Sequence, residues 1–202
     1  MHFTVMLSPS RVRIVIFIPT LGGGGAERIS LRLARGFLAA GLEVDLFVAG
    51  KEEVWDKEVS AGARVFYARA PRTLLSVPKF IAYLRSERPS AALSVLAHAN
   101  VSAALAMRFS KVDAKLVLSE HVVPSQAMRY RRTWKGALTY LVARMTYRWA
   151  DAIVAVSEAV KKDVIRLTGV PGTKVAVIPN PVVDQEIFAL AQEEVHHPFF
   201  QE

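Results

Sequence analysis

Short apolar runs rich in β-branched residues alternate along the chain with segments in which apolar positions recur every three or four residues. The runs predict buried strands, and the wider spacing predicts amphipathic helices. The predicted strands are Val12–Ile18, Glu43–Val48, Arg64–Tyr67, Ala91–Leu96, Leu116–Ser119, Ala152–Val156 and Val175–Ile178. The predicted helices are Ala26–Ala40, Leu74–Arg85, Ala99–Phe109, Trp134–Trp149 and Ser157–Thr168.

Strands separated by helices predict right-handed crossovers and a mainly parallel sheet. The strands are nearly all apolar, as in sheets that helices cover on both faces. The sequence therefore predicts an α/β fold, a doubly wound Rossmann-like domain over residues 11–181. Pro179-Asn180-Pro181 closes the last strand, and Asp184–Leu190 has the pattern of a short helix. We expect residues 182–202 to begin an interdomain linker.

The charge of the chain adds a preference for anions. Its 26 Lys and Arg against 18 Asp and Glu give a formal charge of +8, which attracts phosphorylated ligands, nucleic acid or an acidic membrane face. There is no cysteine, hence no disulfide framework. The apolar stretch from Val12 to Leu21 is too short to cross a bilayer. These features lead us to expect a cytoplasmic protein.

Candidate chemistry lies directly after the predicted strands, because ligands of open α/β sheets bind beyond the carboxyl ends of the strands. The strongest candidate is Gly22-Gly23-Gly24-Gly25, which follows the first strand and opens the first helix. Glycines let the backbone approach a ligand closely, and N–H groups at a helix start bind phosphate oxygens. Four glycines also lose much entropy on ordering, which favours a functional reason for them.

Other phosphate-binding signatures do not fit. A G-x-G-x-x-G fingerprint fails because its last position would be Glu27 or Arg28. Ala49-Gly50 stands where an acidic ribose-binding residue should end the second strand, and the chain has neither G-x-x-x-x-G-K-[ST] nor D-x-D. A Rossmann-type oxidoreductase or epimerase domain remains the alternative. An anion- or nucleic-acid-binding module, suggested by charge alone, is less supported.

Four segments together carry a resemblance to a known family. Pro19–Arg28 resembles the glycine loop and first helix of the retaining GT-B glycosyltransferases of group 1, the family 4 type. Ser119-Glu120-His121, Ala155–Val160 and Val177–Val182 agree with that family in order and spacing. The four segments extend over nearly the whole chain, so the resemblance is that of an N-terminal domain.

The resemblance implies a two-domain enzyme with its active site between two Rossmann-like halves. It implies metal-independent transfer, without other cofactors, from a UDP- or GDP-linked sugar to a glycan or lipid-linked acceptor, as in envelope polysaccharide or glycolipid synthesis. The C-terminal half, with an E-x7-E motif and most of the donor contacts, would be absent here. We therefore expect this chain to be inactive alone and expect no nucleic-acid partner.

The resemblance also implies residue roles. His121 matches a histidine that lies against the donor sugar, where it would stabilise oxocarbenium-like charge, and Glu120 beside it would orient groups on the acceptor side. Backbone N–H groups of the glycine loop would stabilise the leaving diphosphate. The residues predicted to bind donor or acceptor in this loop are Gly22, Gly23, Gly24 and Gly25.

Five further polar residues have weaker assignments. His98 and Asn100 follow a strand end and are candidates for contact with the acceptor, although core or capping roles fit equally well. Asn180, between two prolines, is expected at the crossover to the second domain near the cleft. We interpret Glu27 as a first-turn acid that complements the helix dipole, and Ser157 as a helix N-cap.

Basic and aromatic residues gather late in the chain, a mixture suited to an anionic membrane interface. We therefore expect peripheral contact with the inner face of the cell membrane as one alternative. The competing interpretation buries Tyr147 and Trp149 in the core and leaves the arginines in water. The residues concerned are Arg129, Tyr130, Arg131, Arg132, Trp134, Lys135, Tyr140, Arg144, Tyr147, Arg148 and Trp149.

Overall fold

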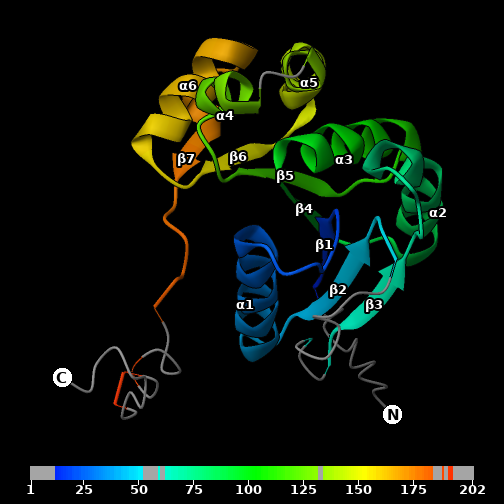
Figure 1. Ribbon diagram of the computed structural model, residues 1–202. Helices are drawn as coiled ribbons and strands as arrows, with labels where there is room; N and C mark the ends of the chain where they lie inside the picture. The colour runs from blue at the N-terminus through cyan, green and yellow to red at the C-terminus, as the bar shows by residue number, and fades with distance from the viewer. Residues whose placement is uncertain are drawn as a thin grey trace, which may run out of the picture.

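A computed structural model describes residues 12–51, 59, 62–131, 134–183, 188 and 191–192. Within these residues, seven parallel strands form one sheet in the order β3-β2-β1-β4-β5-β6-β7 (Figure 1). In chain order the strands are β1 Arg13–Ile18, β2 Glu43–Val48, β3 Arg64–Tyr67, β4 Ala91–Val95, β5 Lys115–Glu120, β6 Ala152–Ala155 and β7 Val175–Val177. Each predicted strand is present with its ends within one residue of the prediction.

The helices connect consecutive strands, as the predicted crossovers require. They are α1 Gly25–Ala39, α2 Val77–Glu87, α3 Ala97–Ser110, α4 Pro124–Arg131, α5 Trp134–Thr146 and α6 Glu158–Thr168. Short 3₁₀ turns precede α2 at Thr73–Ser76, follow α5 at Tyr147–Trp149 and precede β7 at Gly172–Lys174. The α/β, doubly wound, Rossmann-like prediction is confirmed.

Two differences from the predicted helices have local causes. The sequence prediction missed α4, which begins at Pro124, a residue that fits the first turn of a helix because its missing N–H has no partner there anyway. The segment predicted as one helix from Leu74 is a 3₁₀ turn followed by α2, and α2 ends where Arg88 adopts φ 45° just before Pro89.

The alternating side chains of β1 supply both cores. Val15 and Phe17 pack with residues of α2 and α3 on one face of the sheet, whereas Ile16 and Ile18 pack beneath α1 on the other. Figure 1 shows α1 alone on its side of β1 and β2, opposite α2 and α3. Because successive side chains of this apolar run alternate between the two covered faces, all four residues of Val15–Ile18 are buried.

The sheet reverses its winding direction at β1. There β1 pairs with β2 on one edge, through Ile16 and Leu46, and with β4 on the other, through Ile16 and Leu93. The connections after β1 and β4 therefore leave in opposite directions and open a crevice at the carboxyl ends of these two strands. Such a switch point is the usual ligand site of an open α/β sheet.

Candidate functional site

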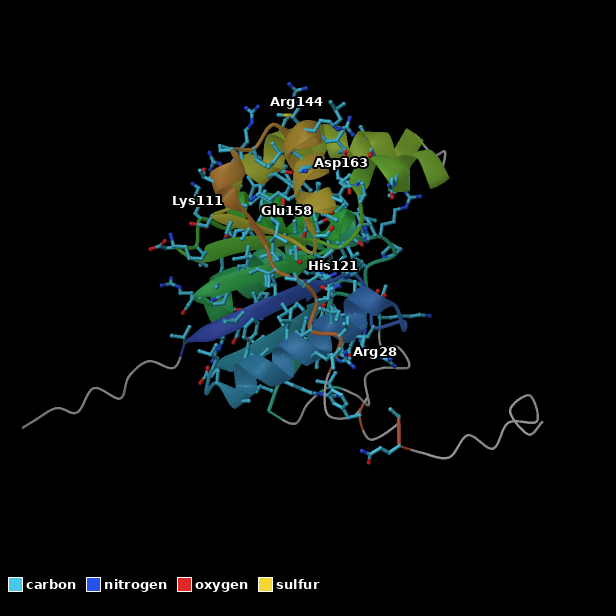
Figure 2. All side chains as sticks on the ribbon, turned by 90° about the vertical axis from the view of Figure 1, so that its left-hand side faces the viewer. Arg28, Lys111, His121, Arg144, Glu158 and Asp163 are labelled. Carbon is cyan, nitrogen blue, oxygen red and sulfur yellow. The ribbon has the colours of Figure 1, made fainter. Side chains whose placement is uncertain are left out.

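A cleft of about 1130 Å³ lies at this switch point. Its walls are the start and outer face of α1, Leu96 after β4, His121 and Val122 after β5, and the segment from Asn180 to Val182 after β7. Figure 2 shows His121 and Arg28 on the face where the segment after β7 runs past α1, while Arg144 lies at the upper edge of the molecule. The cleft thus joins segments from both halves of the sheet.

The glycine loop forms the mouth of this cleft. Gly23 has φ 98°, a backbone conformation that side chains rarely allow, and Gly24 is the N-cap residue of α1 with no side-chain cap. The N–H groups of the first helical turn have no partner within the helix. All four predicted glycines are exposed, and Gly25 lines the cleft.

Glu27 holds the loop from within the first turn of α1. Its Oε1 accepts a hydrogen bond from Thr20 Oγ1 at 3.2 Å, and its other oxygen fills the space beside Gly24. The interpretation of Glu27 as a first-turn acid agrees with this position. Glu27 also lines the cleft, a place that helix-dipole reasoning alone did not predict.

His121 is the titratable side chain of the cleft that follows β5. Its Nε2 lies 3.0 Å from Ser119 Oγ, and the ring is partly buried. Burial lowers the pKa of His121 below its ordinary value, and the negative charge of Glu27 offsets part of that decrease. The imidazole is therefore neutral at neutral pH and can hydrogen-bond a ligand without carrying a charge.

Glu120 and Asn100 lie beneath the cleft rather than in it. Both side chains are fully buried. Glu120 Oε1 accepts hydrogen bonds from Tyr147 Oη and from Asn100 Nδ2 at 3.2 Å, and Tyr140 Oη lies 3.5 Å from Oε2. Burial raises the pKa of Glu120 to about 7, and these donors act against that rise. Burial agrees with the core role that was the alternative for Asn100, and the acceptor-side orienting role of Glu120 stays a prediction.

Leu96 marks a strained turn that the sequence prediction did not identify. It has φ 81°, caps α3 and lines the cleft. A bulky residue in this region of backbone space is an outlier, and such strain concentrates at functional sites. Its N–H donates to Ser119 O at 3.2 Å, which ties the end of β4 to the end of β5 beside His121.

The remaining predicted residues divide between the cleft and other places. Asn180 lines the cleft, and its predicted part in binding donor or acceptor stays a prediction. His98 is exposed in the first turn of α3 and lies outside the residues that form the cleft wall. Ser157 caps α6, accepting a hydrogen bond from Val160 N at 3.3 Å, which confirms the N-cap prediction. Most of Asp184–Leu190 lies outside the described residues.

The late basic and aromatic region differs from both interpretations of it. Tyr140 and Tyr147 are buried, so they are removed from the predicted interfacial surface, whereas Trp149 is 40% exposed rather than in the core. The side chains from Arg129 to Lys135 lie outside the described part of the chain. An exposed stripe on α5 and the turn after it consists of Leu138, Leu141, Met145 and Trp149.

Two general features concern membranes and metals. Among the helices of the described residues, none has the length and apolar character needed to cross a bilayer. In the same part of the chain, no three His, Asp or Glu side chains come together as a metal-binding group. Metal-independent chemistry stays a prediction.

Comparison with known proteins gives one family and one fold. Residues 23–186 match the family described as Glycosyltransferase Family 4. No curated protein matches the chain by sequence. HepE of Anabaena, solved in complex with UDP, is 16% identical, with 90% of this chain and 49% of that chain covered and a TM-score of 0.64.

Two other solved structures are similar in the same way. The lipopolysaccharide outer core galactosyltransferase WaaB is 14% identical, over 84% of this chain and 46% of that chain, with a TM-score of 0.59. The UDP-N-acetylglucosamine 2-epimerase of Rickettsia bellii is 13% identical, over 91% of this chain and 50% of that chain, with a TM-score of 0.66. At these identities the likeness shows the fold alone, and the chain spans about half the length of each of these three structures.

Proposed function

The chain belongs to Glycosyltransferase Family 4, and from this we propose that it is the acceptor-side half of a retaining, metal-independent transferase. The enzyme would move a sugar from a UDP- or GDP-linked donor to a glycan or lipid-linked acceptor, in envelope polysaccharide or glycolipid synthesis. The observation that carries the proposal is the meeting of the glycine loop and His121 in one cleft at the switch point. The family match also weighs against the oxidoreductase or epimerase alternative.

The start of α1 is suited to the donor diphosphate. Exposed glycines allow close approach, and the unpartnered N–H groups of the first turn sit at the positive end of the helix dipole. Glu27, held by Thr20, keeps the loop in one conformation before the ligand arrives. Donors fixed in advance stabilise a leaving diphosphate without the cost of reorganisation.

His121 is suited to the sugar that leaves the diphosphate. A neutral ring oriented through Ser119 Oγ presents its other nitrogen to a hydroxyl or to developing positive charge. Glu120 is buried beneath the His121 ring and fixes the end of β5, from which His121 projects. We assign no covalent role to either residue.

The proposal is tested on a complete enzyme, because we propose that a second Rossmann-like half supplies most donor contacts. The whole product of the source gene is incubated with UDP- and GDP-linked sugars and lipid-linked or glycan acceptors, and the anomeric configuration of the product is determined by NMR. Transfer with retention, undiminished by a metal chelator, supports the proposal. Inversion, or a requirement for a divalent cation, would overturn its mechanism.

We also propose peripheral contact with an acidic membrane, through the apolar stripe of α5. Leu141 and Met145 are 63% and 67% exposed, and Arg144 and Arg148 are exposed beside them. Apolar side chains flanked by arginines fit the boundary between acyl chains and anionic headgroups. A cytoplasmic location on the inner membrane face follows from this partner and remains part of the proposal.

A further inference from the structure

Three arginines line the long wall of the cleft. Arg28, Arg32 and Arg35 follow one another at spacings of four and three residues on α1, so they share one face of the helix, and all three line the cleft. On the other side of α1, Ser30 and Ala34 are buried and do not line the cleft, whereas the buried Leu31 borders it. The arginine face is therefore the side of α1 turned toward the ligand space.

The charge of this wall favours an anion. Among the cleft-lining residues in the described part of the chain, Glu27 carries the one carboxylate against the three guanidinium groups, and His121 is neutral at neutral pH. The planar guanidinium fork matches phosphate oxygens in pairs, which makes arginine the usual residue for phosphate esters. Phosphate is thus the anion that this wall recognises best.

The arginine face extends well beyond the glycine loop. With a rise of about 1.5 Å per residue, Arg35 stands roughly 16 Å along the helix axis from Gly24. A diphosphate held at the loop would not reach Arg35. The wall therefore has room for a second phosphate group, separate from that of the donor.

Arg32 differs from Arg28 and Arg35 in that it binds the segment after β7. Its Nη1 donates hydrogen bonds to Pro181 O at 3.1 Å and Val182 O at 2.7 Å. It thereby holds the segment after β7 against α1 and closes one side of the cleft. An arginine carries five N–H donors. An arginine that makes contacts within the chain therefore still has N–H groups that can donate to a ligand, and this holds for Arg28 and Arg35.

Apolar side chains complete the cleft. Val122 and Val182 are 48% and 53% exposed, and these two residues and Leu96 line the cleft. A volume of about 1130 Å³ is far larger than an inorganic ion requires. The ligand class that fits is a phosphate ester with a sizeable organic part.

We propose that Arg28 and Arg35 bind the phosphate group of a phosphorylated acceptor, the substrate that receives the sugar. This inference rests on the proposed function, because the glycine loop is reserved there for the donor. The phosphate could belong to a lipid carrier or to a soluble sugar phosphate, and both present the same group to the arginines.

The test measures binding to the 202-residue chain by calorimetry. The probes are farnesyl phosphate, glucose 1-phosphate and the neutral analogue farnesol. We expect at least one phosphate ester to bind, farnesol to bind at least tenfold more weakly than farnesyl phosphate, and Arg28→Gln/Arg35→Gln to lose at least tenfold in affinity. Arg108→Gln, which removes an exposed charge from α3 outside the cleft, is the matched control and should bind like wild type.

The two phosphate probes separate the sources of the ligand. Preference for farnesyl phosphate identifies a lipid-linked acceptor, and equal or better binding of glucose 1-phosphate identifies a soluble one. If neither binds, or if the double arginine variant binds like wild type while keeping its thermal midpoint, the inference is overturned. The proposed function is judged apart from this result, by sugar transfer to a neutral acceptor in the complete enzyme.

Discussion

The carboxylate of Glu27 occupies the space that a side chain at Gly24 would need. Its Oε1 is held there by Thr20 Oγ1 at 3.2 Å. The first turn of α1 is thereby shaped without a capping side chain, since the acid three residues along the helix folds back over the cap position. Glycine at position 24 and acid at position 27 form one unit at the mouth of the cleft.

Replacing Gly24 with valine should break this unit. The new side chain displaces the Glu27 carboxylate and blocks approach to the loop, so sugar transfer by the complete enzyme should fall by more than about 100-fold. The thermal midpoint should change little, because the loop is exposed. Gly36→Ala is the matched glycine control, since a Cβ there meets nothing within 4 Å and should add about 1 kcal/mol of stability. Wild-type turnover by Gly24→Val would remove the loop from the site.

His121 should contribute to the rate more than to the fold. We expect His121→Ala to lower kcat by about 100-fold, the range seen when one oriented group at a reacting centre is removed. Because burial lowers the pKa of His121 from 6.5, the ring is neutral at pH 7, and wild-type activity should fall only on the acid side of 6.5. Steady-state kinetics across pH measure both effects. Unchanged kcat in the alanine variant would contradict the assignment.

Glu120 should make the stability of the domain depend on pH. Its pKa is raised to about 7 in the folded chain from 4.5, so its contribution to stability is complete below pH 4.5 and is lost as pH rises through about 7. The free energy of unfolding should fall by roughly 3 kcal/mol over this pH range. Glu120→Gln should remove this dependence in urea unfolding at a series of pH values. The lowered pKa of His121 makes stability rise with pH over part of the same pH range. The variant is therefore compared with wild type at each pH, because both proteins contain His121. Parallel profiles would show that Glu120 is ionised in the fold.

The strands and the glycine loop after the first of them could be predicted from sequence because both depend on local patterns. Buried parallel strands are visible in the sequence as apolar runs. The consecutive glycines after Ile18 indicate, by composition alone, a place where the backbone can approach a ligand closely. Glu120 and Asn100 could not be placed in the same way. Their burial depends on Tyr147, which comes from a turn 27 residues beyond Glu120 and donates into the core. A polar residue after a strand resembles a site residue until its distant partners are known.

The arginine face and the strain at Leu96 were missed for a related reason. Arg28, Arg32 and Arg35 share a helix face by spacing, but only the segment after β7 makes that face one wall of a cleft. The φ of Leu96 depends on the turn between β4 and α3, and no glycine marks it. The apolar stripe of α5, by contrast, could have been found by its three- and four-residue spacing.

That stripe should control attachment to vesicles. Leu141→Glu should reduce co-sedimentation with phosphatidylglycerol vesicles by about tenfold or more, because burying a leucine in an apolar phase contributes about 1.5–3 kcal/mol. Leu75→Glu is the matched control, since Leu75 is 59% exposed in the turn before α2, outside the stripe. Raising the salt should weaken wild-type attachment by screening Arg144 and Arg148. Salt-independent attachment, or equal loss in both variants, would contradict the membrane proposal.

The switch-point cleft as the nucleotide-sugar site is the central claim, and an amide NMR titration of the 202-residue chain with UDP, GDP and NAD tests it most directly. The account predicts that UDP or GDP at millimolar concentration shifts the signals of Gly23, Gly24 and His121, and that Gly24→Val abolishes these shifts. NAD should leave them unchanged. Shifts with NAD alone, or nucleotide-induced shifts confined to residues outside the cleft, would contradict it.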